Sequence, residues 1–91
     1  MKKAVKISVR GTIPAMFFSS YIKENADKLC LRGFVREIDS GSAEVIVEGE
    51  IEMADRMSQI CSQNTQHMTI KEIKVTEIPF QDFKDFKILH I

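Results

Sequence analysis

The segment from residue 9 to residue 37 constrains the fold most, because the spacing of its apolar residues changes twice. Residues 4–11 alternate between apolar and polar side chains, which predicts a half-buried strand that ends at Gly11. After a turn at residues 12–16, apolar side chains recur at helical spacing, as in a surface helix of about three turns. Gly33 ends this pattern, and a second strand is expected at residues 34–39. The helical repeat consists of Phe18, Ile22, Ala26 and Leu29.

The second half of the chain continues with two strands separated by a helix. The hairpin signal Ser40-Gly41-Ser42 leads to a third strand at residues 43–49, in which Glu44 and Glu48 are expected to point to water. A second helix is expected from residue 50 to about residue 64, followed by a fourth strand at residues 68–77. We expect a bulge in that strand between Ile70 and Ile73, where the apolar register slips.

After Pro79, a connection at residues 80–85 precedes a short final strand at residues 86–91. The order is therefore β-α-β-β-α-β with a short last strand. It predicts an α/β fold of the α+β sandwich type, with two helices on one face of a four-stranded antiparallel sheet, the ferredoxin-like plan. We expect residues 1–91 to form a single domain.

Charge and composition narrow the classes of partner. Thirteen basic residues balance thirteen acidic ones, which leaves no electrostatic footprint for nucleic acid or an anionic membrane. The chain has no Trp to stack on bases, and its first apolar run is too short for a signal or a spanning segment. We therefore expect a cytoplasmic protein, with a monomer favoured, that binds neither nucleic acid nor membrane.

Neither the cysteines nor the acidic residues predict a metal site. Cys30 and Cys61 fall inside the expected helices, form no CxxC motif and have no His at ligand spacing, so we expect two free buried thiols. A run of acidic residues lacks the spacing of a calcium loop and is interpreted as a solvated helix start. That run contains Glu48, Glu50, Glu52 and Asp55.

The first helix, its exit and the hairpin carry a spaced set of residues. The set comprises Ala26, Leu29, Leu31, Gly33, Phe34, Val35 and Arg36, then Asp39, Gly41, Glu44 and Val45, and finally Glu48 and Gly49. It resembles the pattern of the acylphosphatase family, in which a turn VQGVGFR precedes a helix with AxxLGL, followed by GWVRN and DGxVEV. The resemblance covers nearly the whole chain and implies the same β-α-β-β-α-β order.

The resemblance also implies a reaction, the hydrolysis of the carboxyl–phosphate bond of acyl phosphates without metal, cofactor or covalent intermediate. In the family, backbone N–H groups of the turn cradle the phosphate and the Arg that ends VQGVGFR clamps it. The Asn that ends GWVRN orients the attacking water. Phosphoryl transfer depends mainly on positioning and on stabilising spread negative charge, so these parts suit the reaction. The small-molecule partner would be phosphate or an acyl phosphate.

Both positions that match the family's catalytic pair are substituted. The clamping Arg becomes Ser19 and the water-orienting Asn becomes Glu37, so a bidentate cation is lost and a negative charge is gained. Pro14 removes one N–H, and side chains at Ala15 and Phe17 replace glycines that favour a converging cradle. The matching turn, which we expect to be a degraded phosphate site, runs through Ile13, Pro14, Ala15, Met16, Phe17, Phe18 and Ser19.

The sequence does not show which other residue, if any, takes over the roles of the missing Arg and Asn. Arg10, Arg32 and Arg36 are near in sequence, but Arg36 adjoins Glu37 on a strand and should point to the opposite face. Ser19 and Ser20 are expected to cap the helix or to be exposed rather than to act as nucleophiles. His67 and His90 are expected to be surface or edge residues.

The sequence leaves three functions open. The first is a divergent acylphosphatase-like protein with lost or much weakened hydrolysis and a binding or regulatory role. The second is an active acylphosphatase with a rearranged phosphate site, in which Arg10 or another residue compensates. The third is a structural or interaction module that uses a sheet edge or the segment with Phe80 and Phe83, which either caps the core or forms an exposed patch.

Overall fold

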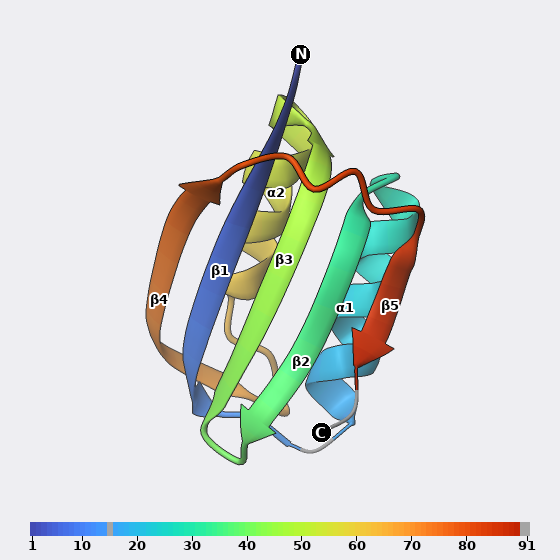
Figure 1. Cartoon of the computed structure of the whole chain (residues 1–91). Helices are drawn as coiled ribbons and strands as arrows, with labels where there is room; N and C mark the ends of the chain where they lie inside the picture. The colour runs from blue at the N-terminus through green and yellow to red at the C-terminus, as the bar shows by residue number, and fades with distance from the viewer. Residues whose placement is uncertain (15, 90–91) are drawn as a thin grey trace.

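The computed structural model describes residues 1–14 and 16–89, so the expectations for Ala15 and His90 lie outside the described residues. Its strands and helices follow the expected order with shifts of a few residues at their ends (Figure 1). They are β1 (Lys2–Thr12), α1 (Phe17–Lys28), β2 (Arg32–Asp39), β3 (Ser42–Glu50), α2 (Ile51–Cys61), β4 (Thr69–Ile78) and β5 (Phe86–Leu89).

Within the described residues the sheet has five strands in the order β4-β1-β3-β2-β5. The expected fold class is right, but the expected four-stranded antiparallel sheet lacked this fifth strand, which pairs in parallel. The final strand joins the sheet by pairing with β2 in parallel, with Phe86 opposite Gly33. This follows from the path of residues 79–85, which we call the strap. The strap crosses the sheet from β4 at one edge to the other edge, so β5 enters in the same direction as β2 (Figure 1).

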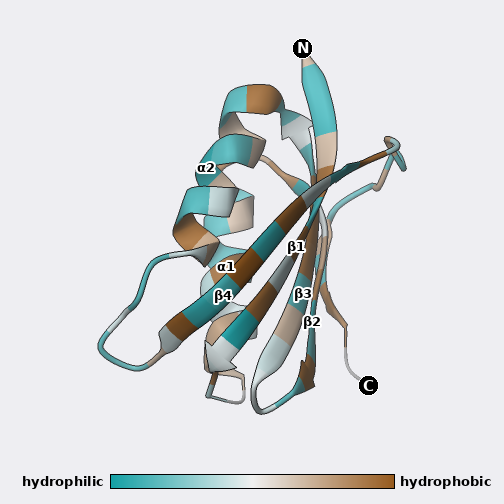
Figure 2. Ribbon diagram, turned by 90° about the vertical axis from the view of Figure 1, so that its left-hand side faces the viewer, coloured by the Kyte–Doolittle hydropathy of each residue, from teal (hydrophilic) through white to brown (hydrophobic). Residues whose placement is uncertain are grey.

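Both helices lie on one face of the sheet, and the core lies between the two layers (Figure 2). The alternation in β1 is confirmed, because Val5, Ile7 and Val9 are buried and face the helices. From α1, Phe18 and Ile22 meet them with no exposed surface. Neither helix of the described residues is long and apolar enough to cross a membrane. The opposite side of the sheet, which we call the open face, carries no helix of the part of the chain that the structure describes (Figure 2).

Two local backbone features, a bulge in β4 and a close approach of strands at Gly33, agree with the predictions made from the sequence. The pairing of β1 with β4 passes from Arg10 opposite Glu72 to Gly11 opposite Ile70, which leaves Lys71 as the extra residue of the expected bulge. Gly33 has φ 140°, and a side chain there would collide with the carbonyl oxygen of Ile46 on β3. Only glycine therefore lets β2 lie against β3 at this point.

Glu48 does not point to water, contrary to the sequence expectation; its side chain is completely buried. It lies on the open face, where the strap covers it and supplies its hydrogen-bond partners. The Glu48 Oε1 atom accepts the backbone N–H groups of Gln81 at 2.7 Å and Asp82 at 3.1 Å, and Oε2 accepts that of Phe83 at 2.7 Å. The sequence could not reveal this, because the partners lie more than thirty residues away.

The cysteines differ from each other, which corrects the expectation of two buried thiols within helices. Cys61 ends α2 and is buried, and this burial raises the pKa of its thiol to about 12. Cys30 is exposed and lies beyond the end of α1, with φ 56° in the left-handed region.

Replacing Glu48 by Gln should destabilise the fold, because an amide NH₂ would face a backbone N–H donor of the strap. We expect Glu48→Gln to lower the free energy of unfolding by about 2 kcal/mol, the scale of a hydrogen bond to a charged group. Urea unfolding measures the loss. The control is Glu50→Gln on the same strand, whose side chain is 59% exposed and should cost less than about 1 kcal/mol. Equal stability of the two variants would contradict this account.

The two thiols should react at very different rates with Ellman's reagent at pH 8. A thiol with a pKa of about 12 is almost entirely protonated at this pH, and only the thiolate is the nucleophile. We expect one thiol, Cys30, to react in the native protein and the second to react only after unfolding. Cys30→Ser should remove the native reaction and Cys61→Ser should leave it; two fast native thiols would show that Cys61 is accessible.

Candidate functional site

The turn that leads into α1 is tied to the β2–β3 hairpin. The backbone N–H of Gly11 donates to the carbonyl oxygen of Gly41 at 3.0 Å, and that of Ile13 donates to Ser40 at 3.4 Å. The hairpin is itself held by Asp39, which accepts the backbone N–H of Gly41 at 2.8 Å. This bond holds the pKa of the Asp39 carboxyl below its usual value. Strand, hairpin and turn therefore position the start of α1 together.

Helix α1 begins without a capping side chain of its own. The residue that precedes it, Met16, adopts the left-handed conformation with φ 69° and makes no side-chain cap, and the first turn of α1 contains no acidic residue. A side chain in this conformation costs about 1–2 kcal/mol relative to the right-handed region. From the sequence, we expected positive-φ geometry to be required at the positions of Ala15 and Phe17. Phe17 instead lies within α1, and the left-handed residue is Met16. Donors at the helix start are thus left for a partner from elsewhere.

Glu37 of β2 is that partner. Its Oε2 atom accepts the Ser19 hydroxyl at 2.6 Å and the Ser19 backbone N–H at 3.2 Å. Its Oε1 atom accepts the backbone N–H of Met16 at 3.3 Å. The expectation that Ser19 caps the helix or is exposed is wrong, because Ser19 is only 3% exposed and its hydroxyl is bonded to Glu37.

A carboxylate is favoured at this place for two reasons. The first N–H groups of a helix have no partner within it, and the helix dipole gives this end a partial positive charge. The same properties make a helix start suitable for phosphate and other anions. In this chain the donors are bonded to a carboxylate of the protein itself. The two residues that the sequence singled out, Ser19 and Glu37, are therefore in direct contact.

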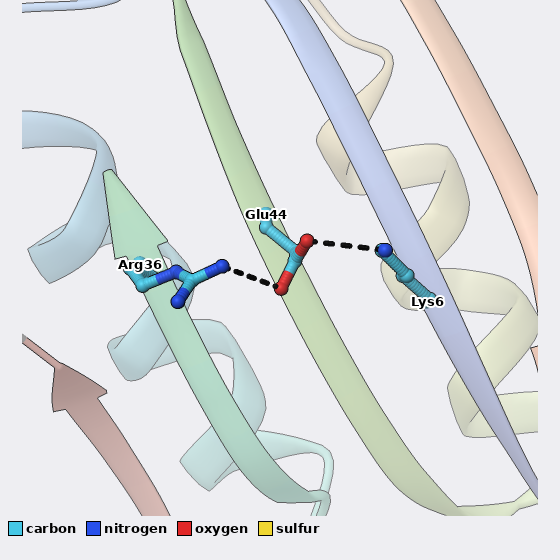
Figure 3. Close-up of polar contacts among 3 residues, drawn as sticks. All are labelled: Lys6, Arg36 and Glu44. Atoms are coloured by element: carbon cyan, nitrogen blue, oxygen red, sulfur yellow. Dashed lines mark hydrogen bonds and ion pairs between the residues drawn. The ribbon is translucent and has the colours of Figure 1, made fainter. Parts of the chain in front are cut away.

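The nearby arginines lie on the other side of the sheet. Arg36 donates to Glu44 Oε1 at 3.3 Å, and Lys6 approaches Glu44 Oε2 at 3.3 Å, on the open face (Figure 3). The expected separation of Arg36 from Glu37 is confirmed, since Glu37 bonds to α1 on the helical side. Strand register also places Arg10 and Arg32 on the open face, because directly paired residues share a face.

The remaining candidates do not join this site. Ser20 and His67 are exposed, and the His67 ring meets that of Phe17 edge to face at 5.2 Å. Phe80 is 43% exposed on the strap, and Phe83 packs on Phe34 at 5.9 Å on the open face, so this pair does not cap the core between the layers. Among the described residues, no three of His, Cys, Asp and Glu gather closely enough to hold a metal ion.

Comparison with known proteins identifies the family. A family model described as Acylphosphatase matches residues 5–88. The chain belongs to the acylphosphatase family. The acylphosphatase of Aeropyrum pernix is 32% identical over 85 residues, which cover 91% of this chain and 84% of that protein. The acylphosphatase of Rubrobacter xylanophilus is 30% identical over 77 residues, covering 85% and 70%. A solved acylphosphatase structure from Coxiella burnetii shares the fold, with a TM-score of 0.90 at 20% identity, over 97% of this chain and 93% of that one.

Sequence reasoning singled out Ser19 and Glu37 but did not predict the contact between them. It also missed Met16, whose backbone N–H completes the set of donors. One signal was available, because no Ser, Thr, Asp or Asn stands immediately before α1. A helix start without a local cap indicates that a distant side chain, a ligand or water supplies the acceptor.

Removing the Glu37 carboxylate should open the turn to an added anion. We expect Glu37→Ala to lower the free energy of unfolding by about 1–2 kcal/mol, since three hydrogen bonds to the carboxylate are lost. Inorganic phosphate at constant ionic strength should then stabilise the variant more than the wild type, because a ligand that binds only the folded state raises stability. Thermal unfolding with and without phosphate measures both effects.

Glu24→Ala provides the control, because Glu24 is exposed on α1 and forms an ion pair with Lys28 of the same helix. Phosphate should affect this variant and the wild type alike. Equal stabilisation of Glu37→Ala and the wild type would show that the Glu37 carboxylate does not occupy an anion site.

Proposed function

We propose that this acylphosphatase-family protein has lost, or retains in much weakened form, the hydrolysis of acyl phosphates, and that it has a binding or regulatory role. The observation that carries this proposal is the bonding of the Glu37 carboxylate to the start of α1. Met16 and Ser19, which would donate to a phosphate in the family's arrangement, donate instead to the protein's own anion. A substrate would have to displace Glu37 before it could bind there.

Charge makes that displacement costly. An acyl phosphate is an anion, and two like unit charges about 4 Å apart repel by about 4 kcal/mol at an effective dielectric constant of about 20. In the family, an arginine would offset such a charge with a bidentate pair of donors, whereas Ser19 has one neutral hydroxyl that already donates to Glu37. Arg10, Arg32 and Arg36 lie on the open face, away from this turn. Each of these features disfavours a bound phosphate.

The alternative of an active acylphosphatase with a rearranged site has one observation in its favour. The turn keeps backbone N–H groups that converge on an anion, at Met16 and Ser19. If Glu37 moved aside, these donors would remain. The missing element would still be a cation close enough to the phosphate to stabilise the charge of the transition state.

Restoring the family's Arg and Asn should restore the hydrolysis of acyl phosphates. We expect wild-type protein to hydrolyse benzoyl phosphate scarcely faster than buffer, and Ser19→Arg with Glu37→Asn to be at least about 100-fold faster. One charged transition-state contact is commonly worth about 10²–10³ in rate. Release of benzoate, followed by ultraviolet absorbance, measures the rate. Wild-type turnover comparable to that of the Aeropyrum pernix acylphosphatase would refute the proposal.

Arginine at a buried position could disturb the fold, so the double variant is compared with Glu37→Asn alone. The single variant removes the negative charge without adding a cation, and it should bind phosphate while remaining much slower than the double variant. Amide NMR spectra establish that each variant is folded. A folded double variant that binds phosphate but stays inactive would place the defect in the turn backbone.

A further inference from the structure

Part of the open face of the sheet carries an excess of positive charge, although the net charge of the chain is zero. Strand register defines which side chains share this face, because directly paired residues point the same way. One row across the sheet runs Thr76, Lys6, Ile46, Phe34 and Lys87, and the next runs Lys74, Ser8, Glu44, Arg36 and Leu89. These two rows contain four cations and one carboxylate. We call Lys6, Arg36, Lys74 and Lys87 the basic band.

The single carboxylate within the rows is already neutralised. Glu44 lies between two cations, with Arg36 at 3.3 Å on one oxygen and Lys6 at 3.3 Å on the other (Figure 3). Lys6 and Arg36 still have 43% and 41% of their side-chain surface exposed. Arg36 Nε is buried and has no hydrogen-bond partner within the described part of the chain. The basic band therefore retains an excess of positive charge and an unused donor.

A hollow of about 470 Å³ adjoins the basic band, between β5, β2 and the strap. Its apolar lining comes from Phe34, Phe83 and Leu89; the two rings meet edge to face at 5.9 Å, and Leu89 is 39% exposed. Lys87 belongs to both the hollow and the basic band. The remaining charged lining residues are Lys84, Asp82 and Asp85. A cavity of this kind accepts one apolar side chain of a partner.

The strap fixes the wall of this hollow before any partner arrives. Phe83, which forms part of the wall, donates its backbone N–H to the buried Glu48 at 2.7 Å, and the two preceding residues donate to the same carboxylate. A wall held by three hydrogen bonds loses little conformational freedom on binding, which favours affinity.

We propose that the open face is a docking surface for an extended acidic peptide segment of a protein partner. One apolar side chain of the segment occupies the hollow, and its carboxylates lie over the basic band. The basic band spans four inter-strand steps of about 4.8 Å each, or about 19 Å, from β5 to β4. Six extended residues reach about 20 Å. The proposal does not depend on the state of the turn at α1.

A protein partner fits better than single-stranded nucleic acid. A protein that binds single-stranded nucleic acid without sequence preference relies on several exposed aromatic side chains, on which successive bases stack. Among the strands of the described residues, Phe34 is the one aromatic on the open face, and Phe83 already packs against it. The face therefore offers cations beside one apolar hollow, which suits carboxylates and a leucine-like side chain.

The test uses a blocked, fluorescein-labelled octapeptide of aspartate and glutamate with one central leucine. Titration by fluorescence anisotropy in low salt should give saturable binding, and amide NMR shifts should map to β2, β5 and the strap. We expect Lys74→Glu with Lys87→Glu to weaken binding at least tenfold. The matched control is Lys28→Glu with Arg56→Glu, which changes the net charge equally but lies on the helices; it should leave binding within about twofold.

Three results would overturn the proposal as a whole, and a fourth would refute the role of the hollow. The first is no saturation up to millimolar peptide. The second is equal weakening by the two double variants, which would indicate a general charge effect. The third is tighter binding of an oligothymidylate of similar length, which would assign the surface to nucleic acid. A peptide with alanine in place of leucine should bind at least fivefold more weakly, and equal binding would refute the role of the hollow.

Discussion

The N–H groups at the start of α1 have no partner within the helix and require an acceptor, and this requirement ties α1 to β2. Met16 adopts a left-handed conformation and offers no cap, so the acceptor comes from β2. Glu37 meets the need with two carboxylate oxygens and links a helix to a strand across the turn. The same donors would serve a phosphate equally well. A bound anion and Glu37 would therefore compete for one set of N–H groups, and in this chain the donors bind the protein's own carboxylate.

Much of the fold could be predicted from local sequence patterns. The spacing of apolar residues shows which side of a strand or helix is buried, and the turn residues show where each element ends. The alternation of Val5, Ile7 and Val9 set the buried face of β1, and the bulge near Lys71 followed from the slip in apolar register. Gly33 marked the close approach of β2 to β3. The family resemblance further singled out Ser19 and Glu37, and the two are bonded to each other.

What the sequence could not predict depends on partners distant in the chain. Glu48 occupies a position that alternation assigns to solvent, and its burial results from a strap whose path no local pattern specifies. The fifth strand was assigned correctly as a strand but not placed in the sheet, since its neighbour depends on that same path. The net charge of zero gave no sign of the positive charge on the open face, because only strand register shows which side chains lie together.

The strap has a further consequence for the edge of the sheet. β5 has four residues and hydrogen-bonds to β2 alone within the described chain. On its N-terminal side the strap is held by the bonds to Glu48 and by the Asp85 carbonyl, which accepts the backbone N–H of Gly33 at 2.9 Å. If strap and β5 detach together, the buried Phe86 leaves the core and β2 becomes a free edge. A free edge presents unpaired N–H and C=O groups, the template for strand addition and aggregation. By holding the strap, the buried Glu48 carboxylate helps to keep the β2 edge covered and so disfavours association of partly opened molecules.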